Sequence, residues 1–339
     1  MKYWQIGAGD WGRRYADEFL RYGMGFVGGK RFIETMKTVK AGDRIILKSG
    51  VSAILAVGEV VEREGKATGE YDKPWLCDFD GWNLAAYCYV RWHSSPRPIP
   101  VKGLTQGTIF EVHKVELRKL AEKLLNELPA TTEYSPDPRP TRRVQDDEIL
   151  EFLVREGLRP GAAEDLTSAF RRIRLLADYY YKNCKWSDVR EHETRTFLIV
   201  PLLLALGWPE QQLKVELSTD KGKADIAGFA RPYKRDKSGE PNNKDCVLIL
   251  ESKGFDIGLS YASGQAQNYA EHFPNCRVIV VSNGYIYKVF PKASDGKFQA
   301  TPSAYLNLLN PQDRYHLDPD KVDGCLEVLR QLLPTTSRA

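Results

Sequence analysis

The segment CVLILESKG, residues 246–254, ends an uninterrupted apolar run with two charged residues. This composition predicts a buried strand, in which side chains point alternately to the two faces of a sheet. Glu251 and Lys253 are two residues apart and are therefore expected on the same face. Burying charged side chains is costly unless they pair with each other or bind an ion. The chain must therefore form a sheet in which one buried strand ends at a charged site.

The segments around this strand predict an α/β domain with a small mixed sheet. In chain order we expect a helix over 188–206, strands over 213–218, 224–230 and 246–252, a helix over 258–273, and strands over 277–282 and 285–290. The dipeptide Asn283-Gly284 favours a two-residue hairpin between the last two strands.

Two more acidic residues are expected close to Glu251. Asp225 begins the strand over 224–230, so its carboxylate lies beside Glu251 if the two strands are neighbours. Glu193 lies on the helix over 188–206, at the edge of an expected apolar stripe. That stripe consists of Phe197, Val200 and Leu204.

This set of charges suits the hydrolysis of a phosphodiester. A divalent cation polarises the phosphate and lowers the pKa of the attacking water, and Mg²⁺ prefers carboxylate oxygens as ligands. Lys253 acts as a base if its pKa is depressed, and otherwise stabilises negative charge. Taken singly, Asp225 is better explained as a turn residue, and Glu251 with Lys253 as a strand-end ion pair. Together on one helix–strand–strand–strand–helix frame they indicate a functional site.

The C-terminal half resembles the PD-(D/E)xK nuclease domain at the N-terminus of type I restriction motor subunits. The resemblance covers about 187–291 and is carried, in order, by ETRTFLIVPLLLALGW, KADIAGF, LILESKG, GQAQNYAEHF and VIVVSNGYIYKVF. It implies an αβββαβ core, a restriction-endonuclease-like fold, and cleavage that depends on Mg²⁺, with Mn²⁺ as a substitute.

The resemblance also implies roles for individual residues. By motif, Glu193 is the helix acid, Asp225 and Glu251 are the metal ligands, Lys253 is the catalytic lysine, and Gln265 and Tyr269 match a Q-x-x-x-Y element one helical turn long. The chain departs from the family in a polar insertion over 231–245, between the strands of the two metal ligands. The sequence contains no Walker motif, so we expect no ATP-driven motor in this chain.

The N-terminal stretch KYWQIGAGDWGRR contains Gly7, Gly9 and Gly12 in the spacing G-x-G-x-x-G. A dinucleotide-binding fold also needs a βαβ unit and an acidic residue about twenty residues further on. The next expected strand, MGFVGG, is followed by Lys30, and the later strands have an antiparallel pattern. This context ranks an NAD-dependent oxidoreductase last among the alternatives.

The first hundred residues resemble the EVE domain, a small β-barrel of the PUA-like superfamily related to YTH readers of modified bases. The resemblance spans about 2–105 and is carried by IETMKTVKAGDRIILKSGVSAILAVGEVVE, KPWLCDFDGW, YVRW and PRPIPVKGL. It implies an aromatic pocket that holds a flipped base by stacking and by hydrogen bonds to its edge. Most tryptophans here are expected in the barrel core. The candidate base-binding residues are Trp11, Ser49, Lys48, Trp75 and Trp82, with Lys48-Ser49 in place of the usual His-Ser.

These features predict an α+β protein of two domains. We expect a base-reading domain over 1–128, a linker over 129–145, a helical connector over 146–186 and a nuclease domain over 187–335. The proline-rich stretch PATTEYSPDPRPTRR favours the linker. The connector is expected to hold helices over 146–156 and 162–183. The basic and aromatic residues of the second helix are interpreted as a packed helix with a solvated face, with contact to the DNA backbone as the alternative.

The joint expectation is a modification-dependent endonuclease that cuts double-stranded DNA containing modified cytosine and acts as a homodimer. Two alternatives stay open, namely a nuclease switched on by a nucleotide or signalling ligand, and a catalytically silent nucleic-acid-binding protein. A net charge of +4 permits DNA binding without requiring it. The longest apolar run, around 197–206, is too short to cross a membrane. Six scattered cysteines and the absence of a signal-peptide pattern favour the cytoplasm.

Overall fold

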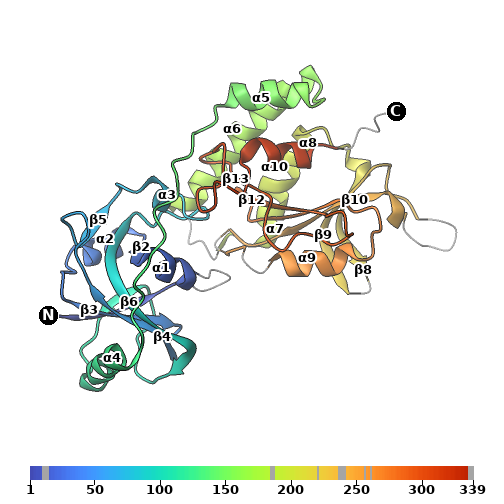
Figure 1. The fold of residues 1–339 in the computed structure, drawn as a ribbon. Helices are drawn as coiled ribbons and strands as arrows, with labels where there is room; N and C mark the ends of the chain where they lie inside the picture. Colours follow the sequence, from blue (N-terminus) through green and yellow to red (C-terminus); the bar gives the residue numbers. More distant parts are fainter. Residues whose placement is uncertain are drawn as a thin grey trace. The chain divides into compact units, whose positions relative to one another are not determined.

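The computed structural model describes residues 1–9, 15–183, 188–219, 221–235, 242–255, 257–259 and 262–334 (Figure 1). The chain forms two compact units, Met1–Pro140 and Thr141–Ala339. It is a mixed α/β protein, and each unit is built around one sheet. No helix within the described ranges is long and apolar enough to cross a membrane.

The N-terminal unit contains a seven-stranded sheet in the order β2-β6-β4-β3-β1-β7, with β5 paired to β6. Its strands are β1 (Tyr3–Gly7), β2 (Met24–Val27), β3 (Arg44–Ser49), β4 (Ala53–Val60), β5 (Thr68–Glu70), β6 (Ala86–Pro100) and β7 (Ile109–Glu111). The expected pairing of β3 with β4 is confirmed, and Gly50 in the turn adopts a φ of 57°. Strand β1 pairs in parallel with β3, whereas β2 pairs with β6. A dinucleotide-binding βαβ unit requires its first two strands to be neighbours, and β1 and β2 are not neighbours here.

Helix α4 (Val115–Glu127) covers one part of this sheet because it is amphipathic. Its buried residues Leu117, Ala121 and Leu124 recur at intervals of four and three, and they share a core with β3 and β4 side chains. The other helices of the unit are α1 (Ala16–Tyr22), α2 (Lys30–Met36) and α3 (Pro74–Cys77).

The expected linker over 129–145 is divided between the two units. Its first part packs on the N-terminal unit, where Thr131 N donates to Trp92 O and the Tyr134 hydroxyl accepts from Trp92 N. Its last part belongs to the C-terminal unit, where Arg142 N donates to Asp313 Oδ1 at 2.7 Å. The boundary between the units is at Pro140 and Thr141.

The expected connector helices are present as α5 (Asp146–Arg155) and α6 (Pro160–Asn183). They do not form a separate segment, because their buried residues belong to the core of the C-terminal unit. In α6, Phe170 and Ile173 are buried in that core, while Arg171 and Arg172 are exposed. This arrangement agrees with a packed helix that has a solvated arginine face.

The C-terminal unit contains a six-stranded sheet in the order β13-β12-β11-β10-β9-β8. Its strands are β8 (Leu213–Thr219), β9 (Gly222–Phe229), β10 (Cys246–Ser252), β11 (Val278–Ser282), β12 (Ile286–Pro291) and β13 (Ala304–Asn307). Strands β10 and β11 are parallel, and the other neighbours are antiparallel. The connection from β11 to β12 has three residues instead of the expected two. In it, Gly284 has a φ of 96° and Asn283 Oδ1 accepts from Ile286 N.

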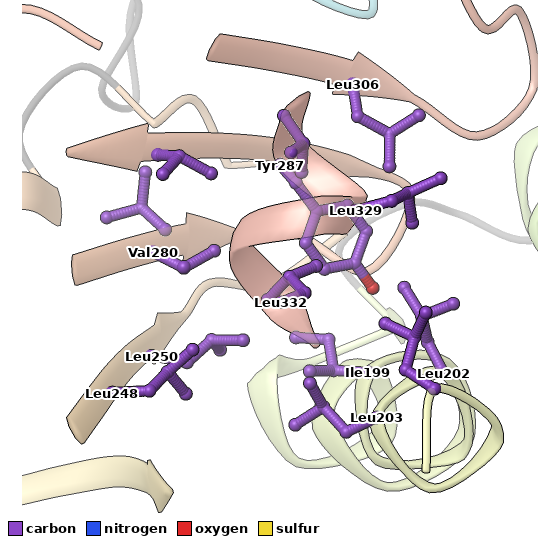
Figure 2. Packing of buried hydrophobic residues seen from close by; sticks show 14 of the residues in the cluster. Ile199, Leu202, Leu203, Leu248, Leu250, Val280, Tyr287, Leu306, Leu329 and Leu332 are labelled. Atoms are coloured by element: carbon purple, nitrogen blue, oxygen red, sulfur yellow. The ribbon is translucent and has the colours of Figure 1, made fainter. Parts of the chain in front are cut away.

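Helices cover both faces of this sheet. They are α7 (Glu191–Thr194), α8 (Val200–Ala205), α9 (Ala262–Ala270) and α10 (Cys325–Leu332), with a π-helical turn over Arg195–Ile199 that joins α7 to α8. Figure 2 shows Leu248 and Leu250 of β10 facing the same core as α8 and α10. Ile249, which lies between them on β10, points to the opposite face, and α9 packs there against β9, β10 and β11. Glu251 lies on this second face.

Candidate functional site

The centre of the site is the end of β10, where Glu251 and Lys253 lie on one face. Leu250 pairs with Ile226 of β9, which brings Asp225 beside Glu251 as expected for neighbouring strands. Glu251 is only 1% exposed, because the strand around it is buried throughout. Lys253 Nζ donates a hydrogen bond to Glu251 Oε1 at 2.5 Å.

A third carboxylate joins the pair from the first turn of α7. One oxygen each of Glu191, Asp225 and Glu251 lies within 4.8 Å of the other two. Lys253 Nζ is also 3.6 Å from Glu191 Oε1. The lysine therefore bridges two of the three acids, and the cluster combines three carboxylates with one ammonium group.

The structure does not bring Glu193 into this cluster, although it was expected there as the helix acid. Its Oε2 atom instead accepts a hydrogen bond of 3.1 Å from Arg190 N, in the capping box that begins α7. Two residues of the expected apolar stripe also face outward, since Phe197 is 49% exposed and Leu204 is 37% exposed, whereas Val200 packs against the core. Glu191 was not predicted from the sequence. Residues two positions apart, such as Glu191 and Glu193, point in directions about 200° apart around the helix axis. An error in the expected phase of the helix therefore exchanges the two glutamates.

Asp225 is held by donors on both of its carboxylate oxygens. Arg195 Nη1 donates to Oδ1 at 2.6 Å, and Ser252 donates to Oδ2 from its backbone nitrogen at 2.7 Å and from Oγ at 2.9 Å. Neither Arg195 nor Ser252 was expected from the sequence. The only available signal was the position of Ser252 between Glu251 and Lys253.

Gln265 and Tyr269 of α9 reach the site together, as expected from their spacing. Lys253 Nζ donates to Gln265 Oε1 at 3.2 Å, and Gln265 Nε2 donates to the Tyr269 hydroxyl at 3.0 Å. Tyr269 is buried, and a Cβ at Gly222 would lie 3.1 Å from its hydroxyl oxygen. Helix α9 therefore fixes the position of the lysine ammonium through a chain of two hydrogen bonds.

The electrostatics of the cluster reflect three acids in a small, largely dry volume. Burial, together with the charges of Asp225 and Glu191, raises the pKa of Glu251 to about 7 against the lowering effect of Lys253. Burial and the charge of Asp225 also raise the pKa of Glu191. Burial opposes the charged form of Lys253, but its hydrogen bond to Glu251 and the nearby acids leave its pKa raised.

One oxygen of the cluster lacks a hydrogen bond. Glu251 Oε2 is buried and has no partner among the described residues. A buried carboxylate oxygen without a donor is costly. With Glu216 beside Arg195, four acids face three cations, Lys253, Arg195 and Lys223, so the negative charge exceeds the positive charge locally. This donor set fits a hard divalent cation, which takes carboxylate oxygens.

The predicted base-binding residues lie at separate elements of the N-terminal unit. Trp11 lies outside the described residues. Lys48 and Ser49 end β3, where Ser49 is exposed and the buried Lys48 donates through Nζ to Gly50 O at 3.3 Å. Trp82 is buried, and its backbone exchanges two hydrogen bonds with Phe79.

Trp75 lies in α3 at the centre of a group of aromatic rings. Its ring centroid is 4.7 Å from that of Tyr22, 6.1 Å from Phe26 and 6.0 Å from Phe79. The indole Nε1 is buried without a hydrogen-bond partner within the described part of the unit. An indole N–H normally finds a partner when it is buried. Trp75 therefore presents a donor that the described residues around it do not satisfy.

A scan of protein-family models and a search of curated proteins both found no match to this chain.

Proposed function

We propose that this protein is a metal-dependent endonuclease that cuts double-stranded DNA containing a modified base, with modified cytosine as the expected target. The C-terminal unit, with a PD-(D/E)xK-type fold, hydrolyses the phosphodiester. The N-terminal unit, a PUA-like barrel of the EVE type, holds the flipped base. The observation that carries this proposal is the cluster of Glu191, Asp225 and Glu251 with Lys253 bonded to Glu251.

In this proposal Glu191, Asp225 and Glu251 hold a Mg²⁺ ion, for which Mn²⁺ substitutes. When bound, such a cation neutralises charge on the phosphate and lowers the pKa of a water molecule. The buried and unpaired Glu251 Oε2 supports this assignment, as do the raised pKa values of Glu251 and Glu191. Glu251 and Glu191 share the single ammonium group of Lys253, which leaves their combined negative charge only partly balanced.

Lys253 stabilises negative charge in this proposal and does not act as the base. Its pKa is raised, so its side chain is an ammonium group at neutral pH. A protonated lysine donates hydrogen bonds and cannot accept a proton. Its bonds to Glu251 and Gln265 direct it toward the three acids, where the charge on the scissile phosphate develops during hydrolysis.

The base-reading half of the proposal is supported by Trp75. Its Nε1, which has no partner among the described residues, and the neighbouring rings combine a hydrogen-bond donor with stacking surfaces, the two kinds of group that hold an extruded base. Two other buried tryptophans of this unit, Trp4 and Trp92, differ because their Nε1 atoms donate to Asp43 Oδ2 at 2.9 Å and to Phe19 O at 3.0 Å, respectively. We therefore assign Trp75 to the base and Trp92 to the core.

The test is cleavage with Mg²⁺ of four matched DNAs that contain unmodified cytosine, 5-methylcytosine, 5-hydroxymethylcytosine or glucosylated cytosine. We expect cutting of one or more modified DNAs only, and loss of that cutting in Asp225→Ala. Equal cutting of all four would keep the nuclease and remove the base-reading function. Cutting of unmodified DNA only after a nucleotide is added would favour a ligand-gated nuclease. No cutting under any of these conditions would contradict the proposal.

Cutting both strands of a duplex requires two active sites, so we propose that the enzyme acts as a homodimer. Sedimentation of the protein with and without modified DNA tests this. A monomer under both conditions would contradict it.

A further inference from the structure

The proposed chemistry leaves Arg195 without a role. Arg195 begins the π-helical turn, and it is only 7% exposed. Its guanidinium group spans two carboxylates, donating from Nη1 to Asp225 Oδ1 at 2.6 Å and from Nη2 to Glu216 Oε1 at 3.0 Å. Guanidinium groups suit this task because their donors form a rigid planar fork.

The second partner of Arg195 is held in an unusual backbone conformation. Glu216 lies in β8 between the register pairs Val215–Ile226 and Leu217–Ala224, directly opposite Asp225. Its φ is 52°, a left-handed conformation that is unfavourable for a residue other than glycine. Such a conformation persists only where the surrounding contacts determine it, and it is concentrated at functional sites. The side chain of Glu216 contacts Arg195, and Lys223 Nζ lies 3.9 Å from its Oε2.

The helix that supplies Glu191 also supplies Arg195. The two residues are four positions apart, so they lie on the same helix face and approach Asp225 together. With the two Ser252 donors on Oδ2, the guanidinium bond to Oδ1 leaves the Asp225 carboxylate little freedom to rotate.

We propose that Arg195, anchored by Glu216, is a positioning residue that holds the Asp225 carboxylate in the orientation in which it ligates the metal. This inference rests on the proposed function, because it requires Asp225 to be a metal ligand. Groups that orient a metal ligand typically change metal affinity by about 10–100-fold when they are removed. Arg195 does not touch the substrate, and it acts only through Asp225.

The test is a titration of the full-length protein with Mn²⁺ alone. Electron paramagnetic resonance measures the concentration of the free ion and thereby the binding. The double variant Arg195→Gln with Glu216→Gln keeps the net charge of the pair at zero, so it removes the orientation without changing the local charge. We expect it to bind Mn²⁺ about tenfold more weakly than the wild type. Arg195→Lys keeps the charge but lacks the fork, and we expect partial rescue, with binding about threefold weaker than the wild type. In cleavage assays kcat should fall while KM for DNA stays unchanged.

A further variant covers the case in which substitutions of the buried Arg195 prevent folding. Glu216→Asp keeps the charge at a half-exposed position but shortens the side chain, so it no longer reaches Arg195, and we expect about threefold weaker Mn²⁺ binding. Asp225→Ala serves as the reference for a lost ligand. If Asp225→Ala loses Mn²⁺ binding while the folded Arg195 and Glu216 variants bind as tightly as the wild type, the positioning role is overturned. If Asp225→Ala binds Mn²⁺ as the wild type does, the proposed metal site fails as well.

Discussion

Lys253 Nζ donates to one oxygen of Glu251 at 2.5 Å, while the other oxygen of Glu251 is buried with no partner among the described residues. Among the described residues, only one of the two oxygens of the Glu251 carboxylate therefore has a hydrogen-bond donor. Asp225 and Glu191 add negative charge at short range. Without a cation, the folded protein favours the protonated form of Glu251, and its pKa rises to about 7.

This relationship predicts how the stability of the metal-free protein depends on pH. The folded pKa of Glu251, about 7, lies above its ordinary value of 4.5. Its contribution to stability is therefore fully present below about pH 4.5 and is lost as the pH rises through 7. At about 1.4 kcal/mol for each pKa unit, the loss is about 3 kcal/mol. Urea unfolding between pH 5 and 8 in a chelating buffer measures it.

The matched control for this prediction is Glu251→Gln, which cannot ionise. We expect a flatter stability profile and a higher free energy of unfolding than the wild type at pH 8 without metal. Added Mg²⁺ should stabilise the wild type at pH 8 and leave the variant unchanged, because the cation replaces the proton on the wild-type carboxylate. The same pH slope in both proteins would show that Glu251 does not titrate in this range.

Lys253→Ala should abolish cutting and leave DNA binding intact. Removing one donor that stabilises charge in a transition state costs about 10²–10³-fold in rate, and Lys253 also compensates Glu251. Cleavage rates and fluorescence anisotropy with modified DNA measure the two effects separately. The control is Lys221→Ala, which removes an exposed lysine of the same unit that pairs with Glu271. A variant at Lys253 that still cuts would refute the assignment of the site.

The two glutamates of α7 provide a second matched pair. Glu191→Gln removes a carboxylate from the cluster, and we expect half-maximal cleavage to need at least about tenfold more Mg²⁺. Glu193→Gln should stay within about twofold of the wild type, because a glutamine side chain still accepts the capping hydrogen bond from Arg190 N. A Mg²⁺ titration of cleavage by both variants decides between the two residues. The reverse result would restore Glu193 as the helix acid.

The strand residues of this site and the α9 pair Gln265 and Tyr269 could be predicted from sequence, whereas the contribution of α7 could not. Strand β10 runs from Cys246 to Ser252 as expected, and the two-residue period puts Glu251 and Lys253 on one face. The apolar stripe predicted from the helical period was wrong because the π-helical turn over Arg195–Ile199 shifts the helix phase between α7 and α8. Phe197 and Leu204 therefore face solvent, and Leu198 and Leu202 are buried in their place.

Long-range pairing in the N-terminal unit was also beyond local sequence patterns. The antiparallel pair β3–β4 follows from adjacent strands with a glycine turn, and it is confirmed. The parallel pair β1–β3 joins Tyr3 to Arg44 across two helices and a strand that pairs elsewhere. No residue pattern within either strand specifies such a partner, because the choice depends on which sheet position the intervening segments leave open.

Trp75→Phe and Trp92→Phe should separate base recognition from stability. Trp92 is fully buried, and its Nε1 donates to Phe19 O and Met24 O. Its replacement leaves these two carbonyl groups without their donor, and we expect a loss of about 1–3 kcal/mol in the free energy of unfolding. Trp75 donates no hydrogen bond within the described fold, so its replacement should cost less than Trp92→Phe in urea unfolding.

The same two variants test base recognition, measured as the ratio of the cleavage rates of modified and unmodified DNA. If Trp75 holds the flipped base, Trp75→Phe should reduce this ratio. Trp92→Phe should leave the ratio unchanged for the protein that remains folded. An unchanged ratio in Trp75→Phe would assign the base pocket to other residues.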